Sequence, residues 1–164
     1  MKHLKDASQN LTSKLISVLD YAKGLKKDSI DPMIPFAFVY VGETGAIKSF
    51  VGDNPEYADK LFEKTILEEK PDYAIYGYDA YLTIDDRKTD AILLKAFDKS
   101  DSVIYLIGQR FIPKQSDTEF ETLGNPAFLG TEENILMKAE SNFLGQAINN
   151  IAEQPTSKPW WKFC

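Results

Sequence analysis

Carboxylates are the side chains of this sequence that could do acid–base chemistry, because the 164 residues include one histidine, His3, and one cysteine, Cys164. Histidine and cysteine supply most zinc ligands and most bases and nucleophiles of hydrolases. The sequence therefore predicts no metal site and argues against a hydrolase with a histidine base. It contains no phosphate-binding loop and no dinucleotide motif, so we expect no cofactor.

Two carboxylates, Asp90 and Asp79, are the candidates for a catalytic role because they fall inside predicted strands. A carboxylate on a strand in apolar surroundings can have a raised pKa, which would suit proton transfer. The structural alternative is that Asp90 hydrogen-bonds Thr83, Gln109 or Arg110 and fixes the strand register, and we favour it. The candidate ligand-binding residues are Tyr81, Asp90, Gln109 and Arg110.

Three consecutive predicted strands carry these residues. They span residues 74–84, 88–97 and 103–112, and the polar links between them are short enough for hairpin turns. For the register we place Ile84 opposite Thr89, and Phe97 opposite Ser102.

In this register both faces of the three-stranded sheet are apolar, since side chains alternate between faces along a strand. One face carries Ala80, Leu82, Ile84, Ala91, Leu93, Leu106 and Gly108. The other carries the candidate interface residues Tyr81, Ile92, Leu94, Tyr105 and Ile107. A sheet with one solvated face alternates between apolar and polar residues. Either helices cover both faces, or one face is a contact surface.

The remaining elements are predicted from periodicity and end signals. Apolar residues at steps of three and four predict helices over residues 4–26 and 55–70, and the first helix has weak initial turns that move its start toward residue 12. Residues 36–41 and 46–51 predict a hairpin. Residues 114–130 predict an irregular connection. Thr131, followed by Glu132 and Glu133, predicts the start of a last helix that ends at Pro155.

This order of elements, α-β-β-α-β-β-β-α, predicts an α+β fold with a five-stranded antiparallel sheet. We expect one domain over residues 1–154 and an aromatic tail, with Trp160 and Trp161, over residues 155–164. The simplest packing places the first and last helices on one face of the sheet, and the middle helix near the other face or an edge. The element order resembles the profilin-like or roadblock-like architecture.

A local pattern lies within residues 76–110. It consists of Tyr78-Asp79-Ala80-Tyr81-Leu82-Thr83-Ile84-Asp85, Arg87, Thr89-Asp90-Ala91-Ile92 and Gly108-Gln109-Arg110. This pattern resembles the core of a family of small, uncharacterised bacterial α+β proteins. The resemblance implies a fold, and it carries no activity and no catalytic residues.

Composition limits the partners. The net charge of −6 gives no electrostatic reason to bind nucleic acid, whose phosphates attract clustered lysine and arginine. No run of about eighteen apolar residues predicts a membrane span, and the polar start lacks the apolar core of a signal peptide. With a single cysteine there is no internal disulfide, and we expect a cytoplasmic protein with no membrane partner.

The leading hypothesis is a non-enzymatic module that acts through protein–protein contact, as a homodimer or with another protein. It rests on the second apolar face, because the predicted helices are too few to cover it comfortably. The alternative is a small-molecule-binding or hydrolytic site between the sheet and the loop of residues 114–130. A third possibility, a bacterial immunity or toxin-neutralising protein, fits the size and the acidity only.

Overall fold

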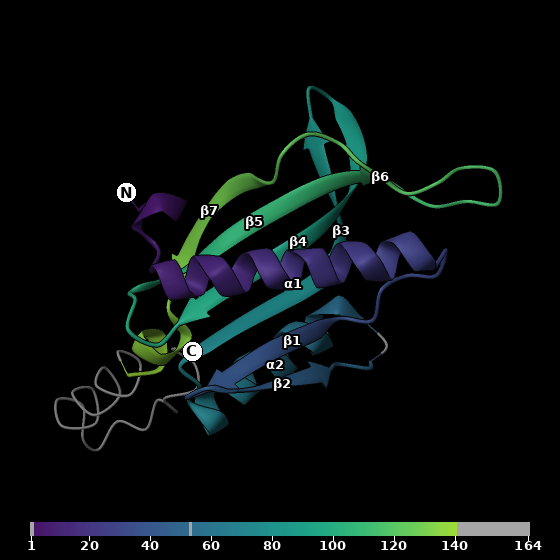
Figure 1. Cartoon of the computed structure of the whole chain (residues 1–164). Helices are drawn as coiled ribbons and strands as arrows, with labels where there is room; N and C mark the ends of the chain where they lie inside the picture. The colour runs from purple at the N-terminus through teal and green to yellow at the C-terminus, as the bar shows by residue number, and fades with distance from the viewer. Residues whose placement is uncertain (1, 53, 141–164) are drawn as a thin grey trace, which may run out of the picture.

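The computed structural model describes residues 2–52 and 54–140, which form an α+β fold built on a curled antiparallel sheet (Figure 1). The predicted fold class is confirmed, but the sheet has seven strands and not five. The elements are a 3-10 turn η1 (Leu4–Asp6), α1 (Gln9–Asp28), β1 (Phe36–Val41), β2 (Thr44–Ser49), α2 (Pro55–Glu69), β3 (Tyr73–Ile84), β4 (Arg87–Asp98), β5 (Val103–Ile112), β6 (Glu121–Thr122) and β7 (Ala127–Glu133). Residues 135–140 are helical.

The two extra strands, β6 and β7, lie in the segment predicted as an irregular connection. The sheet order is β2-β1-β3-β4-β5, and both β6 and β7 pair with β5. The prediction failed because β6 has only two residues, Gly124 lies between the two strands at φ +71°, and Gly130 interrupts β7 at φ +136°. Their pairing depends on the open side of β5, which no local pattern reveals.

The predicted start of the last helix at Thr131 is wrong, because Thr131 pairs with Tyr105 in the β5–β7 ladder. The cap is Asn134, whose Oδ1 accepts hydrogen bonds from the backbone N–H groups of Leu136 (2.9 Å) and Met137 (3.4 Å). Its Nδ2 donates to two carbonyls of the β4–β5 turn, at 3.1 and 3.0 Å. The rest of the predicted helix and the aromatic tail lie outside the described residues.

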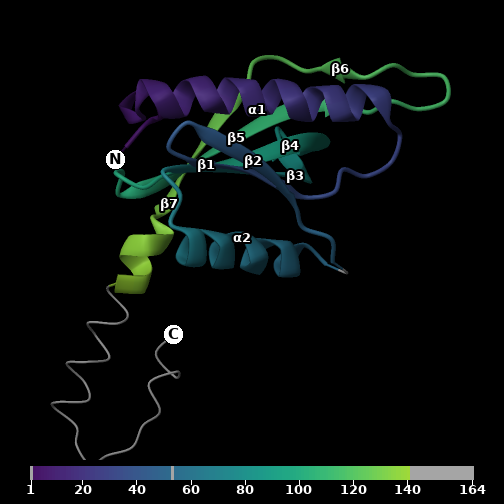
Figure 2. The ribbon, with the colours of Figure 1, turned by 60° about the horizontal axis from the view of Figure 1, so that its bottom comes forward.

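The two long helices cover opposite faces of the sheet (Figure 2). Helix α1 is fixed at its start by Ser8, whose Oγ accepts from the N–H of Leu11 at 3.1 Å. It begins at Gln9, and the residues from Leu4 to Asp6 form the separate turn η1. The α1 side chains buried against the sheet include Leu11, Leu15, Val18, Leu19 and Ala22.

Helix α2 covers the other face and begins as the sequence predicts. Asn54 caps it by accepting from the N–H of Tyr57 at 2.9 Å, and Pro55 occupies its first turn. Phe62 of α2 stacks on Tyr76 of β3, with ring centroids 4.8 Å apart. Ile135, in the described start of the last helix, packs with this α2 cluster and not with α1. The expectation that the first and last helices share a face is therefore wrong for the part described.

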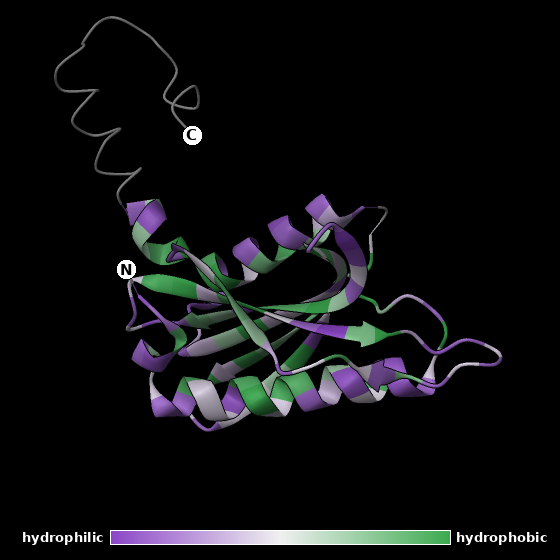
Figure 3. Ribbon diagram, turned by 90° about the horizontal axis from the view of Figure 1, so that it is seen from above, coloured by the Kyte–Doolittle hydropathy of each residue, from purple (hydrophilic) through white to green (hydrophobic). Residues whose placement is uncertain are grey.

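The three central strands are confirmed within one residue of their predicted ends (Figure 3 shows their hydropathy). Asp85 and Asp86 form a two-residue turn with φ of +52° and +62°, so Ile84 pairs with Arg87. The predicted pairing of Ile84 with Thr89 is thus two residues out. A two-residue shift leaves each side chain on its own face, and the predicted faces are correct.

Candidate functional site

Four of the five predicted interface residues lie in the core. Ile92, Leu94, Tyr105 and Ile107 are 0–2% exposed and pack beneath α1. The expectation that the helices are too few to cover both apolar faces is therefore wrong. Helix α1 covers the face that carries Ile92 and Leu94, and α2 covers the opposite face. The sequence could not assign each helix to a face, since that depends on contacts far apart in the chain.

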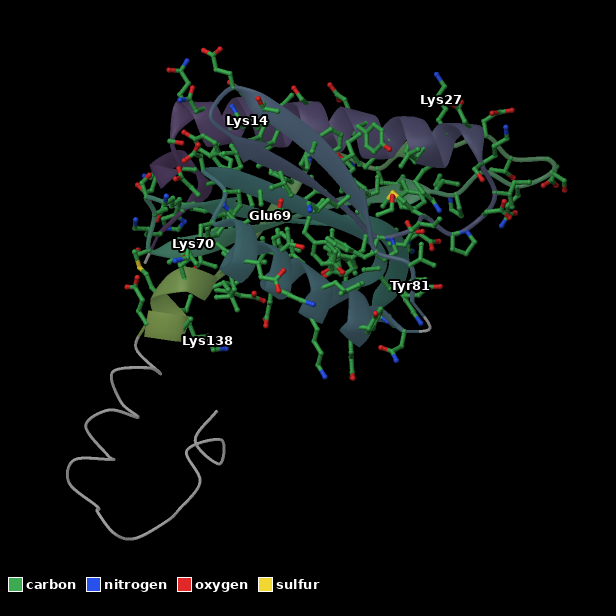
Figure 4. The ribbon with its side chains drawn as sticks, turned by 90° about the horizontal axis from the view of Figure 1, so that it is seen from below. Lys14, Lys27, Glu69, Lys70, Tyr81 and Lys138 are labelled. Atoms are coloured by element: carbon green, nitrogen blue, oxygen red, sulfur yellow. The ribbon has the colours of Figure 1, made fainter. Side chains whose placement is uncertain are left out.

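The fifth residue, Tyr81, is 61% exposed near the β3–β4 turn, at the end of the molecule opposite to Lys70 and Lys138 (Figure 4). The Nζ of Lys88 lies 4.2 Å from the centre of its ring. Asp90 is half-buried directly across from Tyr81. Within the described chain the Asp90 side chain makes none of the hydrogen bonds predicted for it.

Asp79, the other candidate carboxylate, holds the segment after α1 against the sheet. Its Oδ2 accepts from Lys26 Nζ at 3.1 Å and from the backbone N–H of Met33 at 2.6 Å. The Lys26 side chain is 9% exposed and the Asp79 side chain 27%. Lys26 Nζ also donates to the carbonyl of Asp31 at 3.3 Å. The sequence contained both partners, 53 residues apart, but no local signal joins them.

The four predicted ligand-binding residues do not converge. Gln109 is 1% exposed, and its Nε2 donates to the carbonyls of Arg110 (2.9 Å) and Gly124 (3.1 Å). Arg110, as its sequence neighbour on β5, faces the other side of the sheet. The N–H of Leu123 donates to Arg110 O at 2.9 Å, so this part of the loop lies directly against β5.

Strand β2 is largely exposed, and the sequence analysis did not single it out. Five of its six residues are exposed, and Lys48 is half-buried in an ion pair with Glu69 of α2 at 2.6 Å. Among the described strands, β2 is paired on one side only, by β1. Native edge strands are usually protected by several charges, a proline or a bulge. Lys48 is the one charge within β2, and the strand has no proline.

Beside β2 lies a row of aromatic and aliphatic side chains that we call the edge patch: Tyr21, Phe38, Tyr40 and Ile47. The Tyr21 ring meets Phe38 edge-on at 5.0 Å, and Phe38 stacks on Tyr40 at 6.4 Å. Ile47 is 51% exposed and Tyr21 37%. In Figure 1, β1 and β2 lie beside α1 rather than beneath it, so α1 leaves this patch partly open.

Lys14 of α1, labelled in Figure 4, lies against Tyr40 at one end of the edge patch. Its Nζ lies 5.0 Å from the centre of the Tyr40 ring and 4.8 Å from that of Tyr73, within the range of a cation–π contact. Burial raises the pKa of the Tyr40 hydroxyl. The patch therefore presents rings and an ammonium group, but no carboxylate of its own.

Comparison with protein-family models, with curated proteins and with solved structures finds no match for this chain. Of the helices described, none has the length and the apolar character to cross a membrane. Within residues 2–52 and 54–140, no three histidine, cysteine, aspartate or glutamate side chains gather closely enough to hold a metal ion.

Buried tyrosines make the stability of the protein sensitive to alkaline pH. Burial, with the negative charges of Asp59 and Glu132, raises the pKa of Tyr78 to about 12. Burial is also the main cause of the raised pKa of Tyr76 and of Tyr105. The folded pKa exceeds the unfolded value of about 10, so these groups contribute their full stability below pH 10.

We expect the free energy of unfolding to fall as pH rises from about 10 to 12. Each tyrosine that ionises only in the unfolded chain lowers the free energy of unfolding by about 1.4 kcal/mol per pH unit. The three together therefore lower it by about 4 kcal/mol per pH unit. Urea denaturation at a series of pH values measures this slope, and Tyr78→Phe should reduce it by about a third. A free energy of unfolding that stays constant across this range would contradict the prediction.

Proposed function

We propose that this protein is a non-enzymatic module that acts through protein–protein contact, and that two copies join along β2. The observation that carries the proposal is the exposed, singly paired edge strand beside a partly open aromatic patch. Addition of a strand to such an edge satisfies backbone groups and lets neighbouring side chains set specificity. Aromatic residues are enriched in the buried centres of such contacts.

A second copy suits this edge because β2 can pair with itself. Antiparallel pairing about Ala46 places Ile47 opposite Gly45 and Lys48 opposite Thr44, so no like charges meet. The two-fold axis then runs perpendicular to the sheet, and the two edge patches lie side by side on one face. Such a contact is isologous and closed, as in most homodimers.

We expect the purified chain at tens of micromolar to have about twice the 18.5 kDa mass of one copy in light scattering. Ile47→Glu should give a folded monomer, because the substitution places a carboxylate from each copy inside the contact. The side chain is half exposed in the single chain, so the substitution should leave the fold intact.

The matched control is Ile16→Glu, which places the same charge on an exposed residue of α1 outside the edge patch. This variant should remain dimeric. A wild-type chain that is monomeric at these concentrations would contradict the homodimer. If Ile16→Glu and Ile47→Glu weakened a dimer equally, the contact would not lie at β2.

A further inference from the structure

Although α2 covers its face of the sheet, four leucines at one corner of that face remain partly exposed. We call them the leucine corner: Leu82 of β3, Leu93 of β4, Leu106 of β5 and Leu129 of β7. Three of these leucines meet over Gly108. A Cβ there would lie 2.8 Å from Leu82 Cδ1 and 3.1 Å from a methyl carbon of the leucines on β4 and β7. Leu129 is 41% exposed, and the other three are half-buried.

The corner is open because α2 packs over a different part of this face. Phe62 of α2 stacks on Tyr76 of β3. Leu82 lies six residues further along the same strand, which is about 20 Å at the usual rise of a strand. On the opposite face of the sheet, Ile92 and Leu94 are 0–1% exposed beneath α1. A cluster of apolar side chains that stays open in this way marks a contact surface.

The chain that follows β7 enters the same face. Ile135 and Leu136 pack with the α2 cluster, and Figure 2 shows this helical start beside the end of α2. A cleft of about 320 Å³ lies between the two helices, and its walls include Phe62 of α2 and Ile104 of β5. Ile104 and Leu106 point to the same side of β5, because they are two residues apart. The cleft therefore leads from the last described residues toward the leucine corner.

The sequence beyond the described residues has the length and the pattern to cross this corner. Twenty-four residues remain, and they begin with Ser141 and Asn142, whose types favour helix caps and turns, so the chain can reverse there. The apolar residues that follow recur at helical spacing: Phe143, Ala147, Ile148 and Ile151. A helix over residues 143–154 would be about 18 Å long. The path along β5 from Ile104 to Gly108 is about 13 Å.

We propose that residues 143–154 pack on the leucine corner as an amphipathic helix, with their apolar stripe against Leu93 and Leu129. Glu153 is the one charged residue of this segment, so the contact buries little charge. The segment is tethered to the same face, which gives it an effective concentration on the order of millimolar, so even a weak apolar contact holds it in place. A second copy or a separate protein lacks this advantage, because it loses translational freedom on binding.

A nitroxide spin label tests the position of this segment in the full-length chain. The label is attached at Asn149→Cys, in a chain that also carries Cys164→Ser, so that no other thiol reacts. Asn149 lies on the side of the predicted helix opposite to the apolar stripe, so the label leaves the contact intact. Compared with the reduced label, the nitroxide should weaken the amide NMR signals of Gly108 and Leu129 at least twofold. The signal of Ser13, on α1 at the other face, should keep its intensity.

A matched pair of variants tests the surface that receives the segment. Leu129→Asp places a carboxylate in the leucine corner, whereas Leu25→Asp places one on a leucine of α1 with similar exposure, 37% against 41%. In the labelled chain, Leu129→Asp should restore the Gly108 signal at least twofold, and Leu25→Asp should leave it weakened. Circular dichroism checks that both variants are folded. If Leu129→Asp is unfolded, Leu129→Gln repeats the test without a charge.

Three results would overturn the proposal. Signals of Gly108 and Leu129 that keep their full intensity in the folded, labelled chain would leave the corner open to another protein. Equal effects of Leu129→Asp and Leu25→Asp would place the segment elsewhere. Weakened signals in a mixture of labelled chains with unlabelled nitrogen-15 chains would mean that a second copy supplies the segment. The Ile47→Glu variant should give the same results, so none of them depends on pairing at β2.

Discussion

Replacing Ile92 with aspartate is expected to unfold the protein. Ile92 is fully buried beneath α1, at the centre of the β3–β4–β5 sheet. Truncating such a residue to alanine costs about 2–5 kcal/mol, and burying an unpaired carboxylate adds several more. The sum is comparable with the whole free energy of unfolding of an ordinary domain, about 5–15 kcal/mol.

Circular dichroism and urea denaturation measure the effect. Ile92→Val, which removes one methylene group, should lower the free energy of unfolding by about 0.5–1.5 kcal/mol only. Tyr81→Ser, on the same face but exposed, should change it by about 0.5 kcal/mol or less. A soluble, folded Ile92→Asp variant with altered mass would show that this face is an interface and not core.

Gly77→Val should be the second most damaging change. A Cβ at Gly77 would lie 2.7 Å from Cζ of Phe36 and 2.9 Å from Cδ2 of Leu94. Both neighbours are almost fully buried on the strands that flank β3, so neither can move away cheaply. Overpacking a tight core costs about 1–3 kcal/mol, so we expect that loss for alanine and about 3 kcal/mol or more for valine.

Gly24→Ala is the matched control, because a Cβ there meets nothing within 4 Å and the residue lies inside α1. Glycine within a helix is less stable than alanine by about 0.5–1 kcal/mol, so this change should raise the melting temperature. Thermal unfolding of the three variants tests both predictions. Equal stability of Gly77→Val and wild type would show that the strands flanking β3 are not packed as described.

Local chemistry explains what could be predicted. The two aspartates at 85 and 86 tolerate the positive φ of a tight hairpin, so the place of the β3–β4 turn and the faces of both strands could be predicted, although the register was two residues out. Asn54 followed by Pro55 likewise marks the start of α2. In each case a few adjacent residues contain the whole signal.

The ion pair of Asp79 with Lys26 shows what such reasoning misses. The sequence presented Asp79 as a candidate for catalysis, yet its Oδ2 is held by an ammonium group from α1 and by a backbone N–H from the next segment.

The sequence by itself determined the central hairpins, the alternation of their side chains and the apolar character of both faces, because strand period and turn chemistry are properties of neighbouring residues. The tertiary structure decided that α1 covers one face and α2 the other, that β7 completes the sheet, and that β2 keeps an open edge. These outcomes depend on contacts between residues far apart in the chain, whose free energies no local pattern records.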